Sequence, residues 1–133
     1  MKIRKAVETD AEKSYELLES EKEKGFTAND FRNASKHKDA IFLVAENDKG
    51  IIGYVIGFIC PTKKTDAMLA ETRVKESERK MGIGSRLIDA FCKEAFRMGA
   101  KTVYAEVKKK DSKFYGKNRF KKANEWIEMA RKR

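Results

Sequence analysis

Two glycines lie where a strand-like segment gives way to an amphipathic helix, and this junction constrains the fold more than any other part of the sequence. The stretch Arg79-Lys80-Met81-Gly82-Ile83-Gly84-Ser85 follows an apolar run that ends at Val74 and a short charged loop. Glycine permits a tight turn and a close approach of the backbone to a ligand. The first amides of a helix have no partner within it and carry partial positive charge. The stretch therefore predicts a phosphate or pyrophosphate site.

The residues after the glycines have a strong helical pattern. Apolar side chains recur at three- and four-residue spacing from Ile83 to Phe96, and Gly99 ends the pattern. No Gly-Lys-Ser/Thr follows the first glycine as in a Walker loop, and the spacing of a dinucleotide-binding fingerprint fails at Leu87. Two common phosphate-binding motifs are therefore excluded.

The rest of the chain divides into short segments with strand or helix patterns. We expect strands at Ile3–Val7, Ala40–Glu46, Ile51–Cys60, Ala67–Val74, Thr102–Val107 and Ala123–Ala130, and helices from Thr9 or Asp10 to about Lys24, at Thr27–Lys38, from near Ile83 to Gly99 and from Ser112 to about Phe120. The loop Asn47-Asp48-Lys49-Gly50 joins two of these strands as a hairpin. This order predicts an α/β fold with a mixed sheet, in a single domain that spans residues 1–133.

Composition excludes several classes of protein. At 133 residues and 41% hydrophobic content, the chain is long enough for one core of ordinary size. No stretch is long and apolar enough to cross a bilayer, and no signal-peptide pattern opens the sequence. Cys60 and Cys92 lie far apart in the sequence and without metal-ligand spacing. We expect them to be free, buried thiols in a cytoplasmic protein without a metal site.

The glycine stretch matches Arg/Gln-x-x-Gly-x-Gly/Ala, which is the coenzyme A pyrophosphate loop of the GNAT superfamily of N-acetyltransferases. The expected order of elements also resembles the GNAT fold, in which helices flank a mixed, mostly antiparallel sheet and two splayed strands form the acetyl-CoA cleft. The resemblance implies a transferase that moves an acetyl group from acetyl-CoA to a primary amine by direct attack, without a metal. A protein N-terminus, a lysine, a polyamine and a small amine all remain open as acceptors.

Carried onto this sequence, the resemblance assigns the coenzyme to two segments. The backbone of Thr72, Arg73 and Val74 would bind the pantetheine arm, next to a bulge that the family carries in this strand. Arg79 would orient the pyrophosphate loop. The amides that would hold the pyrophosphate belong to Lys80, Met81, Gly82, Ile83, Gly84 and Ser85.

The resemblance also implies a general acid. Residues Phe114 to Phe120 resemble the family segment Phe/Leu-Tyr-x-x-x-Gly-Phe, whose tyrosine lies near the thioester sulfur; here it is Tyr115. A tyrosine pKa of about 10 exceeds the value of about 8.5 for a thiol, so Tyr115 would stay protonated and could donate to the leaving thiolate. Asn118-Arg119 replaces the usual Leu-Gly, so we expect this turn to differ. Asp111-Ser112 lies where the family has Asn-x-x-Ala, in a shortened segment.

A base must remove a proton from the amine, because only the neutral amine attacks a thioester. Glu71 and Glu106 match positions that are often acidic in the family, and either would flank the splayed strands. Each is also consistent with a surface residue that pairs with a nearby Lys or Arg. Phe26 and Phe31 are candidates for the acceptor wall or, alternatively, for anchors in the core.

Two other functions stay open. A catalytically silent GNAT-like module that binds coenzyme A or a partner is suggested by the departures around Tyr115. A nucleic-acid-binding protein is suggested by the formal charge of +10. Because the basic residues occur along the chain among 21 acidic ones, the charge supports an anionic ligand without naming it. The resemblance further implies a possible homodimer.

Overall fold

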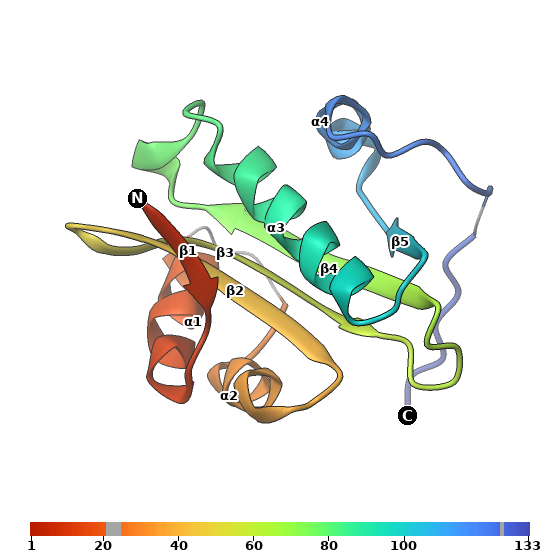
Figure 1. Ribbon diagram of the computed structural model, residues 1–133, viewed down its shortest axis with the longest axis horizontal. Coiled ribbons are helices and arrows are strands. Elements are labelled where there is room, and N and C mark those ends of the chain that lie inside the picture. Colours follow the sequence, from red (N-terminus) through yellow and green to blue (C-terminus); the bar gives the residue numbers. More distant parts are fainter. Residues whose placement is uncertain (21–24, 126) are drawn as a thin grey trace.

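The computed structural model describes residues 1–20, 25–125 and 127–133. Its strands form one sheet in the order β1-β2-β3-β4-β5, with α1 and α2 on one face and α3 on the other (Figure 1). The elements are β1 (Lys2–Lys5), α1 (Ala11–Ser20), α2 (Ala28–Lys36), β2 (Ala40–Asn47), β3 (Gly50–Ile59), β4 (Asp66–Val74), α3 (Ile83–Arg97), β5 (Thr102–Ala105) and α4 (Ser112–Lys117). Neighbouring strands from β1 through β4 are antiparallel, and β5 lies parallel to β4.

The central strand β3 is apolar on both faces, because a separate core lies on each side of it. On one side, Leu87 and Phe91 of α3 are fully buried against the sheet. On the other, Phe31 of α2 packs on Tyr54 of β3, with their ring centroids 5.1 Å apart. A strand that is covered by helices on both faces reads as a continuous apolar run, as the sequence of β3 does.

Helix α3 packs directly on the backbone of β3 at a glycine. A Cβ atom at Gly57 would lie 2.6 Å from Phe91 Cζ and would overlap the carbonyl oxygen of Met68 on β4. Only glycine therefore permits this contact. The close approach fixes α3, and with it the glycine loop at the start of α3, against the sheet.

A β-bulge in β4 changes the direction in which the side chains after it point. Ile56 lies opposite Glu71 and Gly57 lies opposite Leu69, so Ala70 is an extra residue in β4. Side chains alternate along a strand, and an inserted residue therefore reverses the faces of all those that follow it. Leu69 accordingly packs in the core beneath α3, whereas Glu71 bonds Tyr54 on the side of α1 and α2.

The ladder between β4 and β5 is short. It runs from Asp66 opposite Thr102 to Leu69 opposite Ala105, whereas β4 stays paired with β3 as far as Val74. Among the described residues, the edge of β4 that faces away from β3 is therefore unpaired after Leu69. This is the splayed pair of strands that the GNAT resemblance implies.

The expected hairpin, the strand before the glycine loop and the helix after it are all present, with ends shifted by a few residues. The expected end of the first helix near Lys24 lies outside the described residues. Strand β5 ends at Ala105, before Glu106 and Val107. No helix in the described part of the chain is long and apolar enough to span a membrane. Both cysteines are free and half-buried rather than fully buried.

The strand expected at Ala123–Ala130 is wrong. Apart from position 126, which lies outside the described residues, the segment has no regular secondary structure. The side chains of Ile127 and Met129 are 87% and 88% exposed. Alternation favours a strand only where one face can be buried, and here the described apolar side chains have no surface to cover.

Candidate active site

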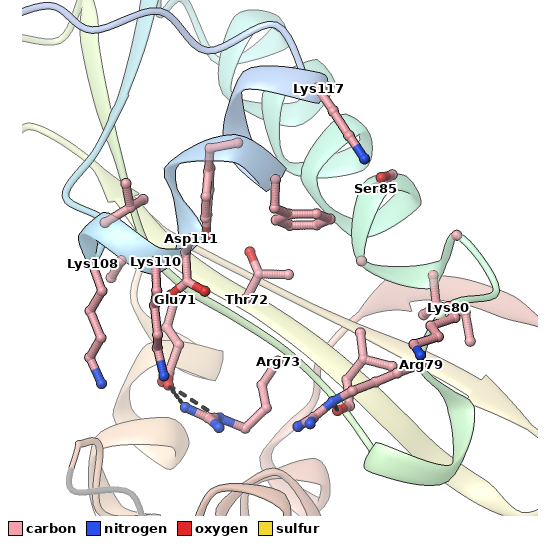
Figure 2. A pocket seen from close by; sticks show the side chains of 18 of the residues that line it. Glu71, Thr72, Arg73, Arg79, Lys80, Ser85, Lys108, Lys110, Asp111 and Lys117 are labelled. Atoms are coloured by element: carbon pink, nitrogen blue, oxygen red, sulfur yellow. Dashed lines mark hydrogen bonds and ion pairs between the residues drawn. The ribbon is translucent and has the colours of Figure 1, made fainter.

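A cavity of about 930 Å³ opens where β4 separates from β5 (Figure 2). Its walls come from β4, the loop before α3, the first turn of α3, the connection from β5 to α4, and α4. Gly25 and Phe26 close the side toward α1 and α2. The remaining lining residues are Ala70, Glu71, Thr72, Arg73, Val74, Glu78, Arg79, Lys80, Gly82, Ile83, Gly84, Ser85, Glu106, Val107, Lys108, Lys110, Asp111, Phe114, Tyr115 and Lys117.

The glycine loop forms one end of this cavity. Lys80 and Gly82 both have left-handed backbones, with φ of 68° and 78°. Gly82 is the N-cap of α3, so no side chain caps the helix, and its carbonyl accepts the first helical hydrogen bond from the amide of Arg86 at 3.1 Å. The amides from Ile83 to Ser85 are consequently left for a ligand. Arg79 Nε donates to the carbonyl oxygen of Val74 at 3.0 Å and joins the loop to the end of β4.

Tyr115 lies where α4 meets the open edge of β4. Its ring packs edge-on against Phe114 and Phe120, with centroid distances of 5.5 Å. Burial raises the pKa of Tyr115, and the nearby Asp111 and Glu71 carboxylates raise it further. The Thr72 hydroxyl is buried without a partner at hydrogen-bonding distance among the described residues, yet it lies near enough to lower that pKa in part. The phenol is thus protonated at neutral pH.

Glu71 is held by two partners. Its Oε2 accepts a hydrogen bond of 2.9 Å from the Tyr54 hydroxyl, and its Oε1 accepts bonds of 3.3 Å from Arg73 Nε and 2.7 Å from Arg73 NH2. Both partners lie on the face that the bulge gives to Glu71. Three of the roughly four acceptor positions of the carboxylate are thus occupied.

Six basic and four acidic side chains line the cavity. Of the acidic ones, Glu71 pairs with Arg73, and Glu78 pairs at 3.3 Å with Lys49 outside the cavity. Arg79, Lys80 and Lys117 surround the end that holds the glycine loop (Figure 2). The field at that end is positive, which suits a ligand with several phosphates.

The turn after α4 contains a non-glycine residue with a left-handed backbone. Arg119 adopts the left-handed conformation, with φ of 70°, in place of the glycine of the family segment. The amide of Phe120 donates to the carbonyl of Tyr115 at 3.1 Å, and the Asn118 side chain donates to the carbonyl of Phe114 at 2.9 Å. Arg119 thus adopts a backbone conformation that glycine adopts most readily. Local hydrogen bonds outweigh the backbone preference of arginine.

The cavity brings together every site residue that the sequence indicated except Met81, whose side chain is 67% exposed. Phe26 lines the cavity, whereas Phe31 is fully buried in the core. Sequence reasoning missed Lys108, Lys110, Asp111, Phe114 and Lys117 as lining residues. For Asp111 a signal existed, because an acidic residue there departs from the family segment. Among the described residues, no cluster of His, Cys, Asp and Glu could hold a metal ion.

The sequence of this chain matches the family described as acetyltransferase (GNAT) family over residues 4–118. The chain belongs to the GNAT family. The match covers the second half of β1, the strands β2 to β5, the glycine loop, α3 and α4. Among curated proteins, none matches this chain significantly.

Solved structures of GNAT acetyltransferases share the fold. An aminoglycoside acetyltransferase from an uncultured soil metagenomic sample, in complex with sisomicin, aligns over 98% of this chain and 95% of its own at 18% identity, with a TM-score of 0.82. Glucosamine-6-phosphate N-acetyltransferase from Arabidopsis thaliana aligns over 98% and 97% at 21% identity, with a TM-score of 0.77. Ribosomal-protein-alanine N-acetyltransferase from Brucella melitensis biovar Abortus 2308 aligns over 98% and 97% at 18% identity, with a TM-score of 0.76.

Proposed function

We propose that this GNAT protein is an acetyl-CoA-dependent N-acetyltransferase that acetylates a primary amine by direct attack. The observation that carries the proposal is the continuity of one cavity. It joins the unsatisfied amides at the start of α3, the unpaired edge of β4 and the phenol of Tyr115. A thioester with a long amide-containing arm and a pyrophosphate fits these three features in that order.

The residues present fit the coenzyme. The amides from Lys80 to Ser85, with Arg79 holding the loop, would bind the pyrophosphate. A Cβ at Gly82 would meet nothing within 4 Å, so the space in front of the loop is open. The backbone from Thr72 to Val74 would pair with the amide groups of the pantetheine arm, because these strand positions lack a neighbour on that side.

The chemistry requires two proton transfers. The amine nitrogen bonds to the thioester carbonyl carbon, and the carbon–sulfur bond breaks. Backbone amides between Thr72 and Val74 would stabilise the charge that develops on the carbonyl oxygen. Tyr115 would protonate the departing thiolate, and its raised pKa keeps the required proton available.

Glu71 and Glu106 form part of the acceptor side in this proposal. Because both oxygens of Glu71 accept hydrogen bonds, Glu71 suits the positioning of Arg73 at the cavity wall better than the removal of a proton. Glu106 is exposed and follows β5 directly. It suits the capture of an acceptor that arrives as an ammonium ion.

The proposed acceptor is a primary amine, and experiment must identify the molecule that bears it. The three similar structures are named for an aminoglycoside, an amino-sugar phosphate and a ribosomal protein. A screen should therefore contain aminoglycosides, amino sugars, polyamines, amino acids and peptides with free N-termini or lysines. Release of free thiol from acetyl-CoA would report turnover.

Calorimetric titration of the purified protein with acetyl-CoA tests the donor site. We expect micromolar binding, and a fall in affinity of more than about tenfold in Gly82→Glu, because the left-handed backbone at Gly82 disfavours a side chain and the new carboxylate would face the phosphates. Asp89→Asn, on the exposed side of α3, is the matched control and should bind like the parent. No binding by the parent would refute the acetyltransferase proposal. Binding without turnover of any amine would instead favour a silent coenzyme-binding module.

A further inference from the structure

We infer that Asp111, which directly precedes α4 and lies four residues before Tyr115, is the general base that takes the proton from the acceptor amine. The inference rests on the proposed acetyl transfer. It assigns the second proton transfer to a residue that stands where the family segment has a different one. Figure 2 shows Asp111 projecting from the start of α4 into the cavity.

Asp111 is the N-cap residue of α4, but its side chain does not cap the helix. Aspartate at an N-cap normally accepts a hydrogen bond from an amide in the first turn, which stabilises the helix by about 1 kcal/mol. Here the carboxylate instead lines the cavity, and it has no hydrogen bond or ion pair with any described side chain. Asp111 has αR dihedrals and ends the 3₁₀ turn Lys109–Asp111 that continues into α4, so its carboxylate is not held at the helix start.

The other carboxylates of the cavity are less suited to the task. Glu71 accepts bonds from Tyr54 and Arg73, and Glu78 is paired with Lys49. Glu106 is exposed, so water competes for its charge. Asp111 is half-buried and free of partners among the described residues, which leaves its oxygens available to an incoming amine.

The spacing of Asp111 and Tyr115 makes them a pair. Residues four apart lie on one face of a helix, one turn from each other. The negative charge of Asp111 contributes to the raised pKa of Tyr115, so the two groups are electrostatically coupled. A carboxylate and a phenol, one helical turn apart, thus line the same cavity.

Asp111 and Tyr115 together can carry out both proton transfers of the reaction. As the amine nitrogen bonds to the carbonyl carbon, its proton passes to an oxygen of Asp111. As the carbon–sulfur bond breaks, the proton of Tyr115 passes to the thiolate. The proton on Asp111 then returns to the phenolate, directly or through one water. The products are the amide and coenzyme A thiol, and both side chains regain their initial states.

Kinetics of Asp111→Asn test the assignment, with the best amine of the acceptor screen and, alongside it, propylamine as a minimal probe. We expect kcat to fall by about 10²- to 10⁴-fold, while the calorimetric affinity for acetyl-CoA stays unchanged. Asp89→Asn, which removes the same charge from an exposed position on α3, should keep the parent rate.

A second measurement does not depend on the acceptor. In protein labelled with ¹³C-tyrosine, NMR titration should show a lower pKa for Tyr115 in Asp111→Asn than in the parent, because a nearby negative charge is lost. An unchanged Tyr115 pKa would contradict the coupling. The charged groups that also line this region are Glu71 and Arg73 on β4, Glu106, Lys108 and Lys110 before α4, and Lys117 on α4.

The outcomes separate this inference from the proposed function. If Asp111→Asn keeps its kcat while Tyr115→Phe loses activity, acetyl transfer stands and the base is wrongly assigned. A raised KM with unchanged kcat would reduce Asp111 to amine binding and overturn the inference. So would a Glu106→Gln variant that loses kcat while Asp111→Asn keeps it. A parent protein that binds acetyl-CoA but acetylates nothing would refute both proposals.

Discussion

The hydroxyl of Tyr54 donates a 2.9 Å hydrogen bond to Glu71 Oε2 from within the core, where the Tyr54 side chain is fully buried. Burial and the negative charge of Glu71 raise the pKa of Tyr54, so the hydroxyl remains a donor throughout the working pH range. The bond connects the packing beneath α2 to the wall of the cavity. Glu71 in turn orients Arg73.

Tyr54→Phe should lower the free energy of unfolding by about 1–2 kcal/mol, because a buried hydrogen bond to a charged group is lost. It should also raise KM for the amine more than KM for acetyl-CoA, since Arg73 loses its support through Glu71. Urea unfolding and steady-state kinetics would measure the two effects. Tyr104→Phe on β5, whose hydroxyl has no described hydrogen bond, is the control. Equal effects of the two substitutions would argue against a positioning role for Tyr54.

Gly57→Ala should destabilise the protein by about 3 kcal/mol or more, because the added methyl group would overlap the Met68 carbonyl and the ring of Phe91. Gly116→Ala in α4 is the matched substitution: its methyl group would meet nothing within 4 Å. Alanine there should stabilise the helix by about 0.5–1 kcal/mol. Thermal and urea unfolding would distinguish the two variants. Similar stability of both would mean that α3 does not pack on β3 as described.

Arg119→Gly should raise the free energy of unfolding by about 1 kcal/mol, because a non-glycine residue pays roughly that amount for a left-handed backbone. The converse change is Gly99→Ala, at a position with φ of 108° and open space for a methyl group. It should destabilise the protein by about 1 kcal/mol or more. Equilibrium unfolding of the two variants should move in opposite directions. A loss of stability in Arg119→Gly would show that the arginine side chain contributes contacts that outweigh the strain.

Asp10 should make stability depend on acidic pH. It accepts bonds of 2.7 and 3.0 Å from Arg4 and one of 2.8 Å from the amide of Val7, and the Arg4 bonds lower its pKa in spite of burial. A carboxylate whose pKa is depressed in the folded state stabilises that state above the unfolded value, near 3.9. The contribution disappears as pH falls through the folded pKa.

Urea unfolding of Asp10→Asn beside the parent would measure this contribution. The parent should be more stable by about 2 kcal/mol at pH 7, and the difference should shrink progressively below about pH 4. Glu16→Gln, whose parent carboxylate forms an exposed ion pair with Lys13, should differ little from the parent at either pH. A difference that stays constant down to pH 3 would mean that ionisation of Asp10 is not its source.

The parts of the site that the sequence predicted are those set by local rules. The loop from Arg79 to Ser85 needs only glycines and a following helix to form, and both can be read along the chain. The pairing of Glu71 with Tyr54 could not be predicted, because it depends on the extra residue at Ala70. A strict alternation would have turned Glu71 toward α3. Bulges depend on the register of the partner strand, which the residues of β4 alone do not specify.

Two further differences have similar causes. The segment Ala123–Ala130 has strand-like alternation, but alternation does not supply a surface against which to pack, and Ile127 and Met129 remain exposed. Asp111 stands out in the sequence only as a departure from the family segment, and its place in the wall of the cavity depends on how α4 packs beside β4. In both cases the packing of distant parts of the chain determines the structure, and the local sequence pattern does not contain that information.

Because of the bulge at Ala70, the two faces of the sheet contribute different residues to the cavity. Residues that would bind the donor depend on the layer built by α3, whereas Glu71 and Arg73 face the layer built by α1 and α2. The two layers belong to separate cores with few shared side chains. Under the proposed function, we expect substitutions in the first forty residues to change which amine is accepted while the acyl donor is held as before. A chain with this layout is open to a change of acceptor through drift or engineering in one layer alone.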